Sequence, residues 1–173
     1  MPTIGVSIAV PEPWGSRLQD FRVTNGDALG SAIPTHITLV PPVEVGQDRL
    51  GDVEDHLEEV AGRSAAYGIH LRGSGTFRPV SPVVFVNLVE GISQTEQLAH
   101  RCRRGPLALE LEYPYHPHVT VAHHLHDDRL DRAFAELEDF DCFFTVDVFH
   151  LYVHDADRGW KATHDFTLAG PGL

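Results

Sequence analysis

Alternation of apolar with small or polar residues predicts several strands along this chain. From Thr3 to Val10 every second residue is Ile or Val, and Gly5, Ser7 and Ala9 lie between them. A period of two predicts a strand with one packed face and a second face that other groups can approach closely. Further strands are expected at 36–39, 67–72, 76–78, 83–89 and 118–121, and residues 107–111 are expected to be extended and to lead into the last of these. A hairpin is expected from 142–153 and 160–168, closed by 155–159.

Apolar residues at helical spacing predict four helices, at 14–21, 47–61, 93–105 and 128–138. The second has one apolar stripe and an opposite face rich in Asp and Glu, which is typical of a helix that packs on a core. Ser93 and Glu96 have the spacing of a capping box and predict where the third helix begins. Pro41 and Pro42 predict the end of the strand before the second helix, because proline cannot continue a central ladder. Residues 170–173 are expected to form a loose tail.

Two stretches share the pattern His, apolar, Thr, apolar. They are His36-Ile37-Thr38-Leu39 and His118-Val119-Thr120-Val121, and their histidines are 82 residues apart. Successive side chains of a strand point to opposite faces, so His36 and Thr38 share one face, as do His118 and Thr120 in their own strand. Two such strands facing one another would bring two imidazoles and two hydroxyls to one small anion.

Each motif is followed by an amphipathic helix and then by strands, which indicates a duplicated lobe. Leu50 lies 14 residues after His36, and Leu130 lies 12 residues after His118. We therefore expect an α+β fold in which residues 1–173 form a single bilobal domain. Each of the two pseudo-symmetric lobes would be a small antiparallel sheet with helices on its outside, and the active cleft would lie between them.

The charge of the chain restricts its partners. It carries 25 acidic and 13 basic residues among 173, a formal net charge of −12. Proteins that bind long nucleic acids without sequence preference need many Lys and Arg side chains to neutralise phosphates. We therefore expect no such binding of long RNA or DNA. A small phosphorylated molecule or an RNA terminus is compatible with this charge.

The sequence also bears on location. No apolar run approaches the roughly 20 residues that a membrane span needs, and the amino terminus lacks the basic n-region of a secretory signal. Cys102 and Cys142 fit no metal-ligand spacing and suggest a reducing compartment, although a disulfide between them remains open. We expect a cytoplasmic monomer without membrane association.

The paired motifs carry the groups that phosphodiester cleavage requires. The reaction needs a base for the nucleophile, an acid for the leaving oxygen, and donors to the phosphoryl oxygens. Histidine, with an ordinary pKa of about 6.5, serves as acid or base near neutrality. Threonine hydroxyls two residues along can donate to non-bridging oxygens. This set of groups needs no metal and no cofactor.

On these residues the chain resembles the two-histidine phosphoesterase superfamily, the LigT-like or 2'-5' RNA ligase family. The order also matches: an amino-terminal strand, a first motif followed by Pro41-Pro42, a helix, strands and a second motif. The resemblance implies that His36 and His118 are the acid–base pair and that Thr38 and Thr120 bind phosphate. It implies opening of 2',3'-cyclic or related nucleotide phosphates, with 2'-5' RNA ligation as the reverse chemistry. The acidic surplus favours a small nucleotide cyclic phosphate over ligation of RNA ends.

Other residues are candidates for substrate contacts or have structural explanations. Arg78 could hold phosphate, and Phe77 and Phe85 could stack on a base, because all three lie on strands between the motifs. Trp160 is a weaker candidate of the same kind, as are Tyr113 and Tyr115. The basic cluster of Arg101, Arg103 and Arg104 is explained by the dipole at the carboxyl end of a predicted helix.

Two alternatives belong to other classes of protein. One is a non-catalytic module that binds a nucleotide or phosphate in the same cleft. The other is a histidine-ligated metalloprotein, because His116 and His118 point the same way on a strand and three further histidines follow by residue 126. Sensitivity to chelators would distinguish the metalloprotein from the phosphoesterase.

Overall fold

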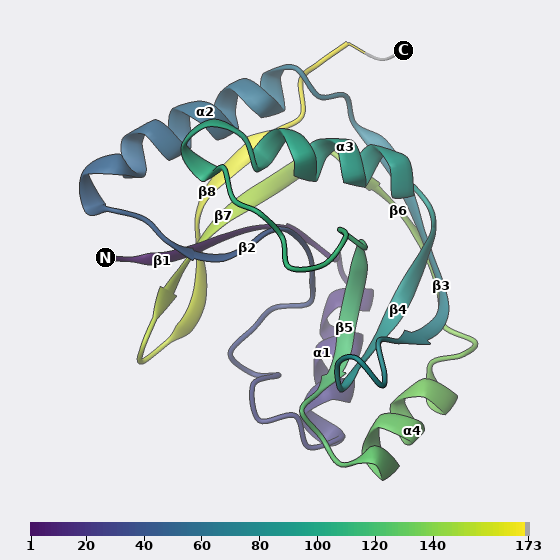
Figure 1. Cartoon of the computed structure of the whole chain (residues 1–173). Coiled ribbons are helices and arrows are strands. Elements are labelled where there is room, and N and C mark those ends of the chain that lie inside the picture. Colours follow the sequence, from purple (N-terminus) through teal and green to yellow (C-terminus); the bar gives the residue numbers. More distant parts are fainter. Residues whose placement is uncertain (172–173) are drawn as a thin grey trace.

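A computed structural model describes residues 1–171 of the chain, and in it the strands form two four-stranded antiparallel sheets (Figure 1). The first sheet has the strand order β2 (His36–Glu44), β1 (Thr3–Ala9), β7 (Val148–Asp155) and β8 (Gly159–Thr167). The second sheet has the order β5 (His118–His123), β4 (Val83–Glu90), β3 (Tyr67–Thr76) and β6 (Asp141–Val146). The α+β fold of two lobes is therefore confirmed.

Four helices cover these sheets in pairs. Helices α2 (Leu50–Gly62) and α3 (Ile92–Cys102) lie over the first sheet, and α1 (Trp14–Thr24) and α4 (Asp127–Glu136) lie beside the second (Figure 1). Single 3-10 turns at Gln47–Arg49 and Gly105–Leu107 complete the regular structure.

The order of elements repeats in the two halves of the chain. The unit β1–α1–β2–α2 is matched by β4–α3–β5–α4, and both motif strands, β2 and β5, lie at the edge of their sheets and in contact with each other. The helix inside each unit packs across onto the other lobe, since α1 contacts β5 and α3 contacts β2. The two lobes are thus interlocked through exchanged helices.

The alternation of β1 determines which side of the first sheet is packed. Ile4, Val6 and Ile8 are 0 to 2% exposed and point toward the helices. Gly5 and Ser7 point to the opposite side, which we call the open face of the first sheet. Each buried aliphatic side chain stabilises the fold by about 1.5–3 kcal/mol.

Two predicted strand boundaries were wrong for reasons of topology. Pro41 and Pro42 do not end β2, because β2 is an edge strand and its pairing with β1 shifts register between Val40 and Val43, where no ladder donor is needed from the two prolines. The glycine-containing segment 73–75 does not separate two strands. It lies within β3, which accommodates it by shifting its register between Leu71 and Ser74.

Three other expectations need correction. Helix α3 begins at Ile92 after Gly91, without a capping box, and the Thr95 hydroxyl instead donates to the Gly91 carbonyl at 2.7 Å. Leu107 is not extended but ends a 3-10 turn, and residues 108–111 belong to no strand. The segment 142–153 is divided at Asp147 into β6 and β7, which belong to different sheets. The hairpin of β7 and β8 is confirmed.

The remaining expectations concern the cysteines, the tail and membrane spans. Cys102 and Cys142 are both free and buried. In the tail, the Gly170 amide donates to the Ser64 carbonyl at 2.9 Å, and residues 172–173 lie outside the described part of the chain. Within residues 1–171, no helix is both long enough and apolar enough to cross a bilayer.

Candidate active site

His36 and His118 begin the two adjacent edge strands and are held in the same way. The Nδ1 atom of His36 lies 2.6 Å from the Pro34 carbonyl oxygen, and that of His118 lies 2.7 Å from the His116 carbonyl oxygen. A carbonyl oxygen can only accept, so Nδ1 carries the proton in each ring. The lone pair of each neutral imidazole is therefore on Nε2, which is the atom available for proton transfer.

The surroundings of both rings favour the neutral imidazole. Burial is the main cause that lowers the pKa of His36 below its ordinary value, and the Arg22 guanidinium adds to this effect. Burial likewise lowers the pKa of His118 to about 4, and the neighbouring histidines, His36 among them, contribute further. In each case the hydrogen bond to the backbone carbonyl acts in the opposite direction. Both histidines are thus neutral in the free protein at pH 7.

Thr38 and Thr120 lie on the same faces as the histidines, and both are partly exposed, whereas the aliphatic residues between them are buried. The backbone of β2 is also fixed from the second lobe, because the Tyr115 hydroxyl donates to the Thr38 carbonyl at 2.6 Å. Arg103 stacks over the Tyr115 ring at 4.8 Å, so these two residues support the site from outside. Tyr113 is 59% exposed.

A pocket of about 120 Å³ lies on the open face of the first sheet beside the first motif. His36 and Thr38 form one side of it, and Gly5 lies where a Cβ atom would be 3.6 Å from the Trp160 ring. The lining consists of Gly5, Ser7, Ile33, Pro34, His36, Thr38, Val40, Pro42, Tyr152 and Trp160. An aromatic wall and small residues next to an imidazole and a hydroxyl suit a flat ligand that carries an anionic group.

The second motif has aromatic surroundings instead. Phe77 and Phe85 are in contact, with ring centroids 4.5 Å apart, and they pack against the His118 ring at 5.0 and 5.3 Å. His116 lies against the same two phenylalanines. The contacts that the structure shows for Phe77 and Phe85 are therefore with a motif histidine, which they desolvate and orient.

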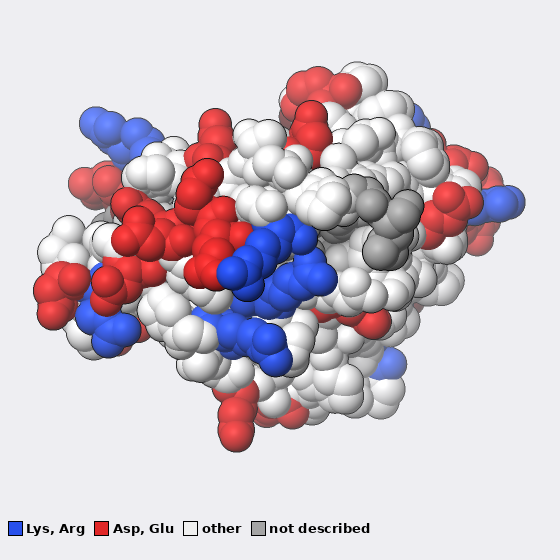
Figure 2. All heavy atoms as spheres, turned by 90° about the horizontal axis from the view of Figure 1, so that it is seen from above, with Lys and Arg blue, Asp and Glu red and all other residues white. Residues whose placement is uncertain are grey.

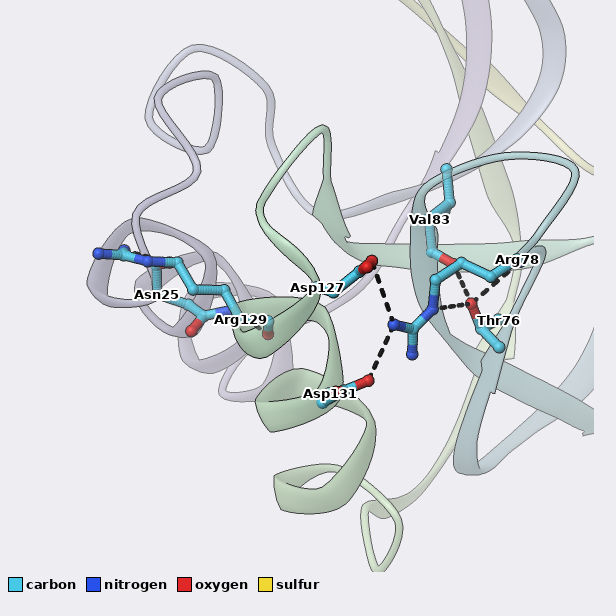
Figure 3. Close-up of polar contacts among 7 residues, drawn as sticks. All are labelled: Asn25, Thr76, Arg78, Val83, Asp127, Arg129 and Asp131. Atoms are coloured by element: carbon cyan, nitrogen blue, oxygen red, sulfur yellow. Dashed lines mark hydrogen bonds and ion pairs between the residues drawn. The ribbon is translucent and has the colours of Figure 1, made fainter.

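Arg78 is engaged in ion pairs (Figure 3). Its guanidinium lies 2.8 Å from Asp131 and 3.7 Å from Asp127, both on α4, and it also donates to the Thr76 hydroxyl. Arg129 lies on the same helix and donates to the Asn25 carbonyl, which ties α4 to the loop after α1. These contacts give Arg78 a structural role, so we do not include it among the proposed substrate contacts.

The histidines and arginines outside the two motifs are also candidates for metal ligands or for a phosphate site. No three His, Cys, Asp or Glu side chains within residues 1–171 are arranged to hold a metal ion. Arg63, Arg101 and Arg104 line a groove between α2 and α3, on the side of the molecule where Figure 2 shows a basic patch bordered by acidic residues. All three lie at the carboxyl ends of these helices, where the dipole favours positive charge.

Three functional candidates were not identified from the sequence. Ser7, Tyr152 and Ile33 line the pocket, but they come from β1, β7 and the loop before β2. The small residues of β1 did indicate a face open to close approach. Nothing local to residues 148–155 could have shown that Tyr152 lines the same pocket as His36.

Comparison with known sequences identifies the family. The profile described as the 2'-5' RNA ligase superfamily matches residues 10–158. The chain belongs to this superfamily. Among its relatives, a protein named "Putative phosphoesterase" from Bacillus cytotoxicus is 31% identical over 140 residues, which are 79% of this chain and 80% of that protein. Another of that name from Bacillus pumilus is 31% identical over 142 residues, or 81% and 82% of the two chains.

Solved structures of other proteins share this fold. A Thermus thermophilus protein superposes with a TM-score of 0.73 at 20% identity over 99% of this chain and 100% of its own. Escherichia coli LigT in complex with 3'-AMP superposes with a TM-score of 0.65 at 20% identity, covering 96% of this chain and 98% of LigT. The two-lobe fold is thus shared with these proteins at 20% sequence identity.

Proposed function

We propose that this phosphoesterase opens nucleoside 2',3'-cyclic phosphates by acid–base catalysis that needs no metal ion. The observation that carries the proposal is the matched pair of imidazoles on adjacent edge strands. His36 and His118 are both held through Nδ1 by a backbone carbonyl, and both have Nε2 free. Two such groups on either side of a phosphorus atom suit in-line displacement.

In the proposed reaction, one imidazole accepts a proton through Nε2 from a water molecule as the water oxygen forms a bond to phosphorus. The bond from phosphorus to one ribose oxygen breaks, and the other imidazole donates its Nε2 proton to that oxygen. The Thr38 and Thr120 hydroxyls donate to the non-bridging oxygens, where negative charge grows in the transition state. Ligation is the same displacement with a hydroxyl of a second ribose in place of water: that hydroxyl loses its proton to one imidazole and bonds to phosphorus, and the ring oxygen leaves with a proton from the other imidazole.

The acid must be protonated before it acts, although both histidines are neutral in the free protein. A bound phosphate carries negative charge, which raises the pKa of an imidazole beside it. The imidazole that acts as the acid therefore takes up a proton from solvent when substrate binds, and it donates that proton to the leaving ribose oxygen. The turnover rate should show a bell-shaped dependence on pH, with one limb from each imidazole.

The pocket of the first lobe supplies a place for the base of the nucleoside. Tyr152 and Trp160 present aromatic surfaces, and Gly5 leaves room beside them. The crystal structure of LigT with 3'-AMP supports a nucleotide as the ligand of this fold. Further LigT structures, one with ATP and one with phosphate, give the same support. A nucleotide base in the pocket would bring its ribose phosphate to His36 and Thr38.

The test is hydrolysis of the four common nucleoside 2',3'-cyclic phosphates in excess EDTA. We expect the wild-type protein to be active, and His36→Ala and His118→Ala to lose about 10²–10⁴-fold of the rate. His126→Ala is the matched control, because His126 is exposed and follows the second motif strand. Activity lost in EDTA would replace this mechanism with a metal-dependent one. An inactive wild-type protein that still binds nucleotides would indicate the non-catalytic module.

A further inference from the structure

A row of polar side chains crosses the open face of the first sheet, starting at Thr38. Strand pairing sets Thr38 opposite Ser7, Ser7 opposite His150, and His150 opposite Asp165, on β2, β1, β7 and β8 in turn. Residues paired directly across antiparallel strands share one face of the sheet. The row therefore extends outward from the proposed phosphate site over two strand spacings to His150, about 10 Å.

Ser7 contributes a polar side chain to the pocket. The residue is 7% exposed and lines the pocket together with Thr38, which lies opposite it on β2. Its hydroxyl can donate a hydrogen bond to a ligand bound there, or accept one from it.

His150 is held ready for a hydrogen bond by its neighbour on β8. Its Nδ1 lies 2.7 Å from an Asp165 carboxylate oxygen, and the side chains are 17% and 70% exposed. A carboxylate acceptor keeps the proton on Nδ1, so the neutral ring presents Nε2 as an acceptor. The His150 ring also packs on Tyr152 at 6.0 Å, and Tyr152 lines the pocket.

The second lobe has no such row. Opposite Thr120 stands Phe85, and opposite Phe85 stands Gly75. The polar row is therefore not a general requirement of the motif strands. It is a feature of the lobe that also contains the pocket.

We propose that Ser7 and His150, oriented by Asp165, form a subsite that recognises the free 5'-hydroxyl of a nucleoside 2',3'-cyclic phosphate. This inference rests on the proposed function. Such a substrate has three groups to recognise: the cyclic phosphate, the base and the 5'-oxygen. The first is assigned to His36 and Thr38 and the second to the aromatic pocket, which leaves the 5'-oxygen for the polar row between them.

The charge at the subsite favours a hydroxyl over a second phosphate. Asp165 carries a negative charge beside His150, and no Lys or Arg lines the pocket. The chain as a whole has a formal charge of −12. A 5'-phosphate would meet repulsion there, whereas a 5'-hydroxyl would donate to Nε2 of His150. The substrate class is thus the mononucleoside cyclic phosphate rather than the 5'-phosphorylated or chain-linked form.

The test compares adenosine 2',3'-cyclic phosphate with its 5'-deoxy and 5'-phosphorylated analogues. For the wild-type protein we expect kcat/KM to fall about three- to tenfold when the 5'-hydroxyl is removed, the loss of one neutral hydrogen bond, with most of the change in KM. In His150→Ala the parent substrate should lose a similar factor, and removal of the hydroxyl should cost nothing further. Asp165→Asn should reduce the ratio of kcat/KM for the parent substrate to kcat/KM for the 5'-phosphorylated analogue. His164→Gln is the matched control, because His164 lies on the same hairpin but faces Glu54 of α2.

The outcomes separate the two proposals. If none of the three compounds is turned over, the proposed function fails and this subsite fails with it. If the parent and the 5'-deoxy compound are turned over equally by the wild-type protein, the subsite is wrong while the proposed function stands. That comparison changes only the substrate, so it does not depend on the folding of any variant. The subsite would be supported if the parent and 5'-deoxy substrates had equal kcat/KM in His150→Ala and still differed in His164→Gln.

Discussion

The two motif regions of this protein have the same backbone geometry and different surroundings. Each histidine begins an edge strand and binds the carbonyl two residues before it through Nδ1. Beside the first motif there is a pocket with Ser7 opposite Thr38. Beside the second motif the space is filled by aromatic side chains, and Phe85 lies opposite Thr120.

The difference indicates how the two halves of a duplicated site can take on different roles. The shared features, namely the ring orientation and the neutral imidazole, are those that proton transfer requires. The differing features lie one strand further into each sheet, where the first lobe can accept a nucleoside and the second lobe encloses a histidine in apolar contacts. In the proposed function, both lobes contribute catalytic groups and bind the phosphate, and only the first lobe recognises the nucleoside.

The largest expected effect is on the free energy of unfolding as a function of pH, because His118 is buried as a neutral group. Its pKa is about 4 in the folded protein, mainly because of burial, and about 6.5 in the unfolded chain. Between these values the unfolded chain binds more protons, so stability is complete above pH 6.5 and falls as the pH decreases toward 4, by about 3 kcal/mol. Denaturant unfolding from pH 4 to 7 should show this loss, and His118→Gln should flatten the curve. An unchanged slope in the variant would mean that His118 is not buried as described.

The next effect compares two strand glycines, one from each lobe. A Cβ atom at Gly75 would lie 2.6 Å from the Phe85 ring, whereas one at Gly5 would lie 3.6 Å from the Trp160 ring. Gly75→Ala should therefore destabilise the protein by about 1–3 kcal/mol through overpacking. Gly5→Ala should change stability by less than about 0.5 kcal/mol. Thermal unfolding of the two variants checks this. Equal losses would contradict the contrast between a filled lobe and an open one.

The smallest effect concerns the two threonines. Each hydroxyl is expected to give one hydrogen bond to the phosphate, about 0.5–1.5 kcal/mol. Ser7 lies beside Thr38 and can compensate in part, whereas Phe85 beside Thr120 cannot. In kcat/KM for a nucleoside 2',3'-cyclic phosphate, Thr120→Val should thus cost more than Thr38→Val. The double variant Ser7→Ala with Thr38→Val should remove this difference. A larger loss of kcat/KM in Thr38→Val than in Thr120→Val would contradict the proposed compensation by Ser7.

The local pattern of the sequence was enough to predict the two motif strands and which side chains share a face. Alternation over four residues places His36 with Thr38 and His118 with Thr120, and it does not depend on the rest of the fold. Pro41 and Pro42 were misjudged because edge position is a property of the whole sheet. The proline pair is compatible with a strand only at such an edge.

The polar row shows more clearly what local patterns leave out. Ser7, His150 and Asp165 become neighbours only through the pairing of β1 with β7 and of β7 with β8. The first of these pairings joins opposite ends of the chain, and no periodicity within either segment encodes it. The division of residues 142–153 between two sheets was missed for the same reason.

The exchanged helices have a consequence for how substrate enters. Helix α1 belongs by connectivity to the first lobe and packs on β5, and α3 belongs to the second and packs on β2. Opening the lobes like a hinge would pull both helices from the strands that bear the histidines. The separation of the two imidazoles is therefore built into the frame before any ligand arrives. A frame braced from both sides holds the two imidazoles at one spacing, to which the phosphate of a ligand has to conform.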